Sequence, residues 1–104
     1  MNCHYNYTKN EIHFILHQLN EEKLKDLLAL NRNQIRDDFI LKCVDVARAF
    51  AFLNYNEQNV LRHLFFYKDS PGVTSWKLSI DKEKVYYVKR VGLNAIIKKL
   101  NGQS

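Results

Sequence analysis

The chain has little of what separates or cross-links domains, because its 104 residues include one proline, three glycines and two cysteines. No stretch rich in Ser, Gly or Pro divides it, so no linker between domains is expected. Since 46% of the residues are apolar, the chain is able to bury a core of its own. We therefore predict a single domain over residues 1–104.

Long apolar runs and targeting signals are also missing. No segment approaches the roughly 18 apolar residues that a membrane span needs, and the first residues lack the pattern of a signal peptide. The two cysteines, Cys3 and Cys43, are too few for a disulfide framework, which favours a reducing compartment. We expect an intracellular protein, in the cytoplasm or nucleus of its host cell, with no membrane partner.

The sequence contains no motif of catalysis or of cofactor binding. A Gly-rich phosphate loop and a Gly-x-Ser-x-Gly elbow are both absent. His13 and His17 share one face of a predicted helix and follow Cys3 and His4, but no Cys-x-x-Cys spacing accompanies them. We expect neither enzymatic activity nor a cofactor nor a metal ion.

What the sequence does have is positive charge, concentrated in its last third. The first 67 residues contain eight Lys or Arg and eight Asp or Glu, so their formal charges cancel. Residues 68–104 contain eight Lys or Arg but only three Asp or Glu, and they hold all of the net charge of +5. Clustered cations bind a phosphate backbone because binding releases condensed counterions, which favours nucleic acid as the partner. The alternative is a solvated lysine-rich surface that keeps a small protein in solution.

Apolar residues at helical spacing predict about four helices in the first two thirds of the chain. Thr8 and Glu11 have the spacing of a capping box, so a first helix is expected over about 9–19. Asn20 is placed to cap a second, short helix, which ends before Asn31.

The two helices that follow are longer and more apolar. A central helix is expected over 34–53, although its β-branched and aromatic residues 39–41 favour a short strand as an alternative start. The next helix has Asn54 or Asn56 as its cap and ends at 68–72.

Beyond residue 72 the apolar pattern changes from helical to alternating. Residues 75–80 alternate apolar with polar side chains, and residues 85–91 are rich in strand formers. We predict a β-hairpin with a charged tip at 81–84 and a short last helix over 93–100. The expected fold class is therefore α+β, mostly helical, with about four N-terminal helices, a hairpin wing and a short C-terminal helix.

Residues 45–64 are a predicted helix, a polar turn and a second helix, a unit that is able to present its second helix to the major groove of DNA. There, Asn and Gln pair with adenine and Arg pairs with guanine. A plain helical hairpin within the core is the alternative. The side chains expected to face the DNA are Asn56, Gln58, Asn59, Arg62 and His63.

The predicted hairpin supplies a second contact, because basic wings beside helix-turn-helix units lie along the phosphate backbone. Exposed lysines that keep an edge strand from aggregating are the alternative explanation for its charge. The cations expected to contact phosphates are Lys77, Lys82, Lys84, Lys89 and Arg90 of the hairpin and Lys98 and Lys99 of the last helix.

Two segments resemble the Bro-N domain, a family found in insect-virus BRO proteins and in phage antirepressors. The first runs from Asp45-Val46-Ala47 through Ala49-Phe50-Ala51-Phe52 and Asn54 to Leu61-Arg62-His63. The second is Val91-Gly92-Leu93-Asn94-Ala95-Ile96-Ile97. The resemblance covers about residues 39–100 and implies a DNA-binding domain of viral or mobile-element type that acts in transcription control.

Together, these features predict a small non-enzymatic regulator that binds duplex DNA. The rival hypothesis is a viral or phage module that docks on a host or partner protein, and a homodimer is compatible with either. Its contact surface would be aromatic, around Phe65, Phe66, Tyr67 and Trp76. Phe66 discriminates between the two, since a continuous exposed patch with Tyr67 and Trp76 favours the protein partner.

Overall fold

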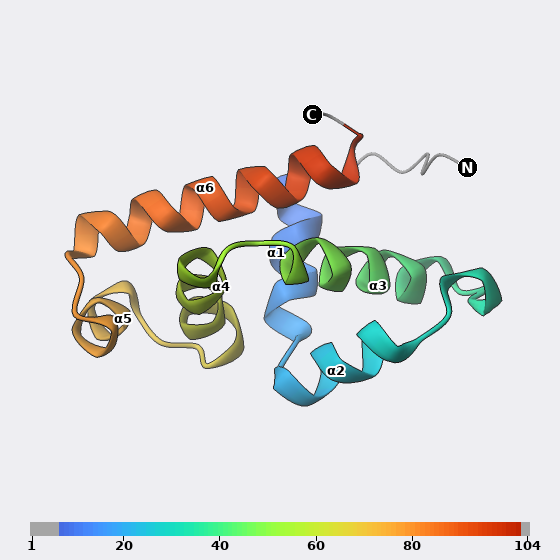
Figure 1. Cartoon of the computed structure of the whole chain (residues 1–104), viewed down its shortest axis with the longest axis horizontal. Helices are drawn as coiled ribbons and strands as arrows, with labels where there is room; N and C mark the ends of the chain where they lie inside the picture. Colours follow the sequence, from blue (N-terminus) through green and yellow to red (C-terminus); the bar gives the residue numbers. More distant parts are fainter. Residues whose placement is uncertain (1–6, 103–104) are drawn as a thin grey trace.

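The structure, a computed structural model, describes residues 7–102, which fold into six α-helices with one 3₁₀ turn and one π-helical segment. The longest helix, α6, runs along the long axis of the molecule, and α2 to α5 lie below it in Figure 1. Helices α4 and α5 are seen nearly end-on, so both cross α6 at a steep angle. The elements in chain order are α1 (Lys9–Gln18), α2 (Glu21–Ala29), η1 (Arg32–Gln34), α3 (Asp38–Ala51), α4 (Tyr55–Leu61), η2 (Arg62–Phe66), α5 (Pro71–Leu78) and α6 (Lys82–Leu100).

Short polar side chains start the first two helices, as the sequence predicts. The Thr8 hydroxyl accepts a hydrogen bond from the Glu11 N–H at 3.1 Å, and the Glu11 carboxylate accepts one from the Thr8 N–H. Asn20 caps α2 by accepting from the Lys23 N–H at 2.8 Å. Each cap satisfies a backbone donor that has no partner within the helix. The predicted first and second helices are thereby confirmed.

The central helix α3 begins later than predicted, at Asp38 rather than Gln34. The reason is Asp37, whose carboxylate accepts from the Ile40 N–H at 2.9 Å and so fixes the start of the helix. Residues 39–41 belong to this helix and form no strand.

The main core gathers side chains from α1, α3, η2 and α6. In η2 the Tyr67 N–H bonds the Arg62 carbonyl, five residues back, at 2.9 Å. This wider turn lets both Phe65 and Phe66 point inward, where Phe66 stacks on Phe50 with ring centres 5.2 Å apart. Further members of the core that are fully buried include Ile12, Leu16, Leu61 and Ile96.

The predicted β-hairpin and the α+β class are wrong, because the described residues contain no strand. Ser70 caps α5, and Pro71 occupies its first turn, where a missing N–H costs nothing. Ser79 ends α5 in the left-handed conformation, with φ of 57°. The predicted hairpin tip at 81–84 is instead the start of α6, and the predicted last helix is the second half of that same helix.

Burial along one face explains why residues 85–91 are helical. Val85, Val88, Gly92 and Ile96 recur every three or four residues, and all four are buried. The preference of valine and tyrosine for strands is weak and is outweighed by this packing. Gly92 sits mid-helix because a Cβ there would lie 3.2 Å from a methyl group of Leu61 in α4.

The two ends of the described chain meet beside the end of α6. The Tyr7 N–H donates to the Asn101 side chain at 2.9 Å, and the Asn101 amide donates back to the Tyr7 carbonyl at 3.2 Å. The Tyr7 hydroxyl also donates to the buried carboxylate of Asp45 at 3.1 Å. Asp45 accepts in addition from Arg32 at 2.8 Å, so one carboxylate ties η1 and Tyr7 to α3.

Thr74 offers a test of packing in α5. It is fully buried, and its hydroxyl has no hydrogen-bond partner among the described residues. Because an unsatisfied buried hydroxyl is costly, the isosteric change Thr74→Val should raise the free energy of unfolding by about 1 kcal/mol in urea titration. Thr74→Ser is the control, since it keeps the hydroxyl and loses the methyl group. A Thr74→Val protein less stable than wild type would contradict this packing.

The histidines of α1 are expected to make the free energy of unfolding depend on pH. His13 and His17 pack on Phe65, with ring centres 5.3 and 4.6 Å away. Burial, and then the charges of Lys89 for His13 and Lys68 for His17, lower the pKa of both imidazoles below 6.5. Since the unfolded state then binds protons more readily, stability falls as the pH drops below about 6.5.

The double variant His13→Gln, His17→Gln removes both titrating groups. Its urea midpoint should fall less than that of the wild type between about pH 7.5 and about pH 5.5. An equal fall in both proteins would show that other groups carry the dependence.

Candidate nucleic-acid interface

Helices α4, α5 and α6 enclose a groove of about 330 Å³, here called the α4–α6 groove. It brings together four side chains that the sequence separates by up to 28 positions, Asn56, Asn59, Lys77 and Lys84. All four belong to the predicted DNA contacts. The remaining side chains that line the groove are Tyr55, Val60, Leu78, Ile80 and Val88.

Local structure positions each wall of the groove. Asn54, rather than Asn56, caps α4 by accepting from the Glu57 N–H at 2.8 Å, and Glu57 completes the capping box. This leaves the Asn56 side chain uncommitted in the first turn. Asn59 lies three residues later, on the same side of the helix. The opposite wall carries Lys84, in the first turn of α6.

The charged side chains that line the groove are both lysines, and no carboxylate lines it. Lys77 forms an ion pair with Asp69 at 3.2 Å, and His63 contacts the same carboxylate at 3.0 Å. The hydrogen bond from His63, followed by that from Lys77, lowers the pKa of Asp69 below its usual value. Lys84 makes no ion pair with a described residue, so its charge is available to a ligand.

Two aromatic side chains of α4 and α5 are largely exposed. Tyr55, in the wall of the groove, exposes 77% of its surface, and Trp76, which precedes Lys77 in α5 but does not line the groove, exposes 81%. The sequence identified Trp76 only as part of a protein contact and did not identify Tyr55. The signal available for Tyr55 was its place directly after the capping residue Asn54, where a side chain of α4 points to solvent.

Two predicted DNA contacts instead brace the turn between α3 and α4. The Gln58 amide donates to the carbonyls of Ala51 at 3.2 Å and Leu53 at 3.0 Å. Arg62 donates to the Gln58 amide oxygen at 3.1 Å and to Glu21 of α2 at 2.6 Å. Its guanidinium also lies 5.3 Å from the centre of the Phe50 ring. These contacts occupy both side chains within the fold.

His63 is occupied in the same way. Besides its contact with Asp69, its ring packs edge-on against Tyr67, with centres 5.0 Å apart. It lies in η2, beyond the end of α4, and does not line the α4–α6 groove.

The other predicted cations are spread around α6. Lys89 points toward the core side, with its ammonium 6.0 Å from the Phe65 ring. Arg90 lies over Tyr87 of the same helix at 5.4 Å, and Lys82 and Lys98 are exposed. Lys99 lies 4.1 Å from the Phe52 ring centre, in a separate pocket that it shares with Arg32 and Arg48. The predicted contacts therefore do not form one face.

The aromatic contact surface of the rival hypothesis is not continuous. Phe66 exposes only 8% of its surface and belongs to the core, as does Phe65. Tyr67 and Trp76 are exposed without it. The condition that favours a protein partner at this surface is therefore not met.

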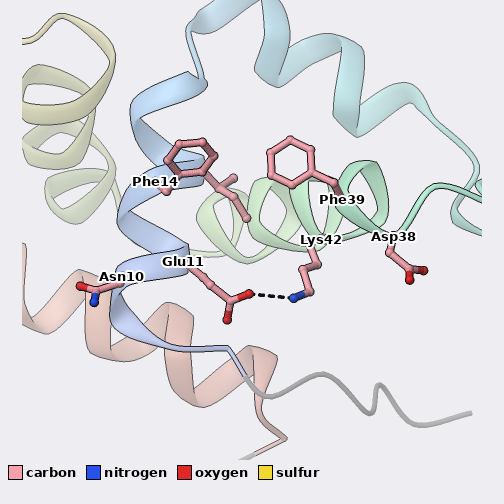
Figure 2. A pocket seen from close by; sticks show the side chains of 7 residues that line it. Asn10, Glu11, Phe14, Asp38, Phe39 and Lys42 are labelled. Carbon is pink, nitrogen blue, oxygen red and sulfur yellow. Dashed lines mark hydrogen bonds and ion pairs between the residues drawn. The ribbon is translucent and has the colours of Figure 1, made fainter.

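A different apolar surface lies between α1 and α3. Phe14 and Phe39 are both half-exposed, and their rings are 6.2 Å apart at a pocket of about 490 Å³ (Figure 2). Below them Lys42 and Glu11 form an ion pair at 2.7 Å. That hydrogen bond lowers the pKa of the Glu11 carboxyl. Sequence reasoning assigned Glu11 to a capping box and residues 39–41 to a possible strand, but it placed none of these four side chains in a surface site.

Neither a metal cluster nor a membrane-spanning helix is found in the part of the chain that the structure describes. No three His, Cys, Asp or Glu side chains of residues 7–102 lie close enough to hold a metal ion, and Cys3 and His4 lie outside this range. None of the described helices is long and apolar enough to cross a membrane. Burial raises the pKa of the Cys43 thiol, which favours its unreactive form.

No family model, no curated protein and no solved structure matches the chain. The resemblance to Bro-N domains therefore stays a prediction, and the fold and the groove carry the functional argument.

The variant Gln58→Ala tests whether Gln58 has a structural role or a role in DNA recognition. Gln58→Ala should lower the free energy of unfolding by about 1–2 kcal/mol in urea, because two carbonyls and Arg62 lose a partner. Its DNA affinity should match that of the wild type under conditions in which both are folded. Gln18→Ala, at an exposed site on α1, is the matched control. A loss of affinity without a loss of stability would assign Gln58 to recognition instead.

Proposed function

We propose that the chain is a small, non-enzymatic DNA-binding regulator whose contact surface is the α4–α6 groove. The proposal rests on one observation. Two amides that make no hydrogen bond with a described residue, Asn56 and Asn59, line the same groove as two lysines, Lys77 and Lys84. Amides pair with base edges, and lysines neutralise phosphates. The regulatory role rests on the Bro-N resemblance, and the test below compares duplex with single-stranded DNA as the target.

The geometry supports a smaller contact than the one predicted from sequence. It retains Asn56, Asn59 and Lys84, and also Lys77, which lines the groove although it pairs with Asp69. Lys82 is an additional candidate, because it is exposed in the same first turn of α6 as Lys84. With Gln58, Arg62 and His63 engaged within the fold, base contacts depend on α4 alone.

The proposal is tested by fluorescence anisotropy of a labelled mixed-sequence DNA, duplex and single-stranded, at several salt concentrations. Lys77→Gln, Lys84→Gln should weaken binding and flatten the plot of log K against log salt. The slope should change by about 0.7–0.9 for each lysine that contacts a phosphate. Loss of the exposed pair between Lys77 and Asp69 should cost little stability, which urea titration verifies.

Lys23→Gln, Lys25→Gln is the matched control, because it removes the same charge from exposed sites on α2. Its salt slope should equal that of the wild type. The proposal is wrong if neither DNA form binds, or if both double variants weaken binding equally, since binding would then follow net charge alone.

A further inference from the structure

We infer that the nucleic acid bound at the α4–α6 groove is single-stranded, with an unpaired base in the groove beside Tyr55 and a neighbouring base stacked on Trp76. The inference rests on the proposed function and names the form of its ligand. Four observations lead to it: the shape of the groove, the state of its amides, the exposure of its aromatics and the placement of its lysines.

The shape of the groove disfavours base reading by Asn59 in a duplex. A protein reads a duplex by inserting a convex helix into the major groove, which is about 12 Å wide. Asn59 instead lies half-buried within a concavity, between α4 and the walls made by α5 and α6. A concavity of about 330 Å³ has the size of a small-ligand site, so a single base is able to enter and a double helix is not.

The amides in the groove are free to recognise a base. Asn54 and Gln58, their neighbours in sequence, cap α4 and brace its turn. The Asn56 and Asn59 side chains make no hydrogen bond with a described residue. Each amide offers both a donor and an acceptor, which match the edges that an unpaired base exposes.

Tyr55 and Trp76 differ from most other exposed aromatics of the protein. Tyr67 contacts His63, Tyr87 lies under Arg90 and Phe52 lies under Lys99. Tyr55 and Trp76 have no ring contact with a described residue, although they are 77% and 81% exposed. Free aromatic faces beside a positive groove are the combination by which proteins hold unpaired bases.

The lysines lie where a strand entering the groove needs them. Lys77 extends from α5 and Lys84 from α6, so cations from two helices border the site of the base. Trp76 directly precedes Lys77 in α5 but does not line the groove, so its ring meets a base where the strand continues along α5 past Lys77. A strand passing from Tyr55 to Trp76 would thus meet both kinds of contact in succession.

The experiment uses the single tryptophan of the chain as its own probe. The intact protein is titrated with a single-stranded DNA of about 20 nucleotides and with the duplex of the same sequence, while Trp76 fluorescence is recorded. The single strand should quench Trp76 and bind at least about tenfold more tightly than the duplex. Trp76→Ala should weaken single-strand binding about 5- to 150-fold by anisotropy, since stacking on one aromatic contributes a factor of that size.

Trp76→Phe keeps an aromatic face and should retain most of the affinity. Tyr87→Ala, which removes an exposed aromatic from α6, is the matched control and should leave binding unchanged. Preferred duplex binding with unquenched Trp76 overturns the inference and leaves the proposed function standing. Equal effects of Trp76→Ala and Tyr87→Ala also overturn it. Failure to bind either DNA overturns the proposed function itself.

Discussion

The close approach of α4 to α6 at Gly92 is the constraint on which the rest of this half of the molecule depends. Without a side chain at Gly92, Leu61 and Glu57 of α4 lie directly against the backbone of α6. Leu61 is fully buried there and reaches the main core. The contact fixes α4 across α6, and α5 then closes the remaining side. The groove lies beside this contact, where Asn56 and Asn59 of α4 face Lys84 of α6 and Lys77 of α5.

How well the sequence predicts the fold depends on whether the deciding contacts are local. The N-terminal helices follow from caps such as Thr8 and Asn20, whose partners lie three residues away. The segment 85–91 has strand-forming residues, and only its packing on α4 and α5 decides its conformation. Gly92 is ambiguous in the same way. A glycine within an apolar run indicates the end of a helix, unless a neighbouring helix packs so closely that a side chain does not fit.

The candidate site was likewise predictable only where local features decide it. Residue type and charge placed Asn56, Asn59, Lys77 and Lys84 among the twelve predicted contacts, but they did not show that these four line one groove. The hydrogen bond from Arg62 to Glu21 was not predictable, because the two residues lie 41 positions apart in the sequence. Counting charge along the sequence also misleads for a helix. At 3.6 residues per turn, the cations of α6 point to several sides.

The reciprocal hydrogen bonds between Tyr7 and Asn101 have a consequence for how this fold combines with others. Asn101 lies about 25 Å along α6 from Lys84, at 1.5 Å per residue. Both ends of the described chain therefore meet at the end of α6 that lies away from α5 (Figure 1). Modules joined before Tyr7 and after Asn101 would therefore connect to the fold at neighbouring points. The architecture thus suits a terminal attachment or an insertion into a larger protein, with the groove facing outward at the far end.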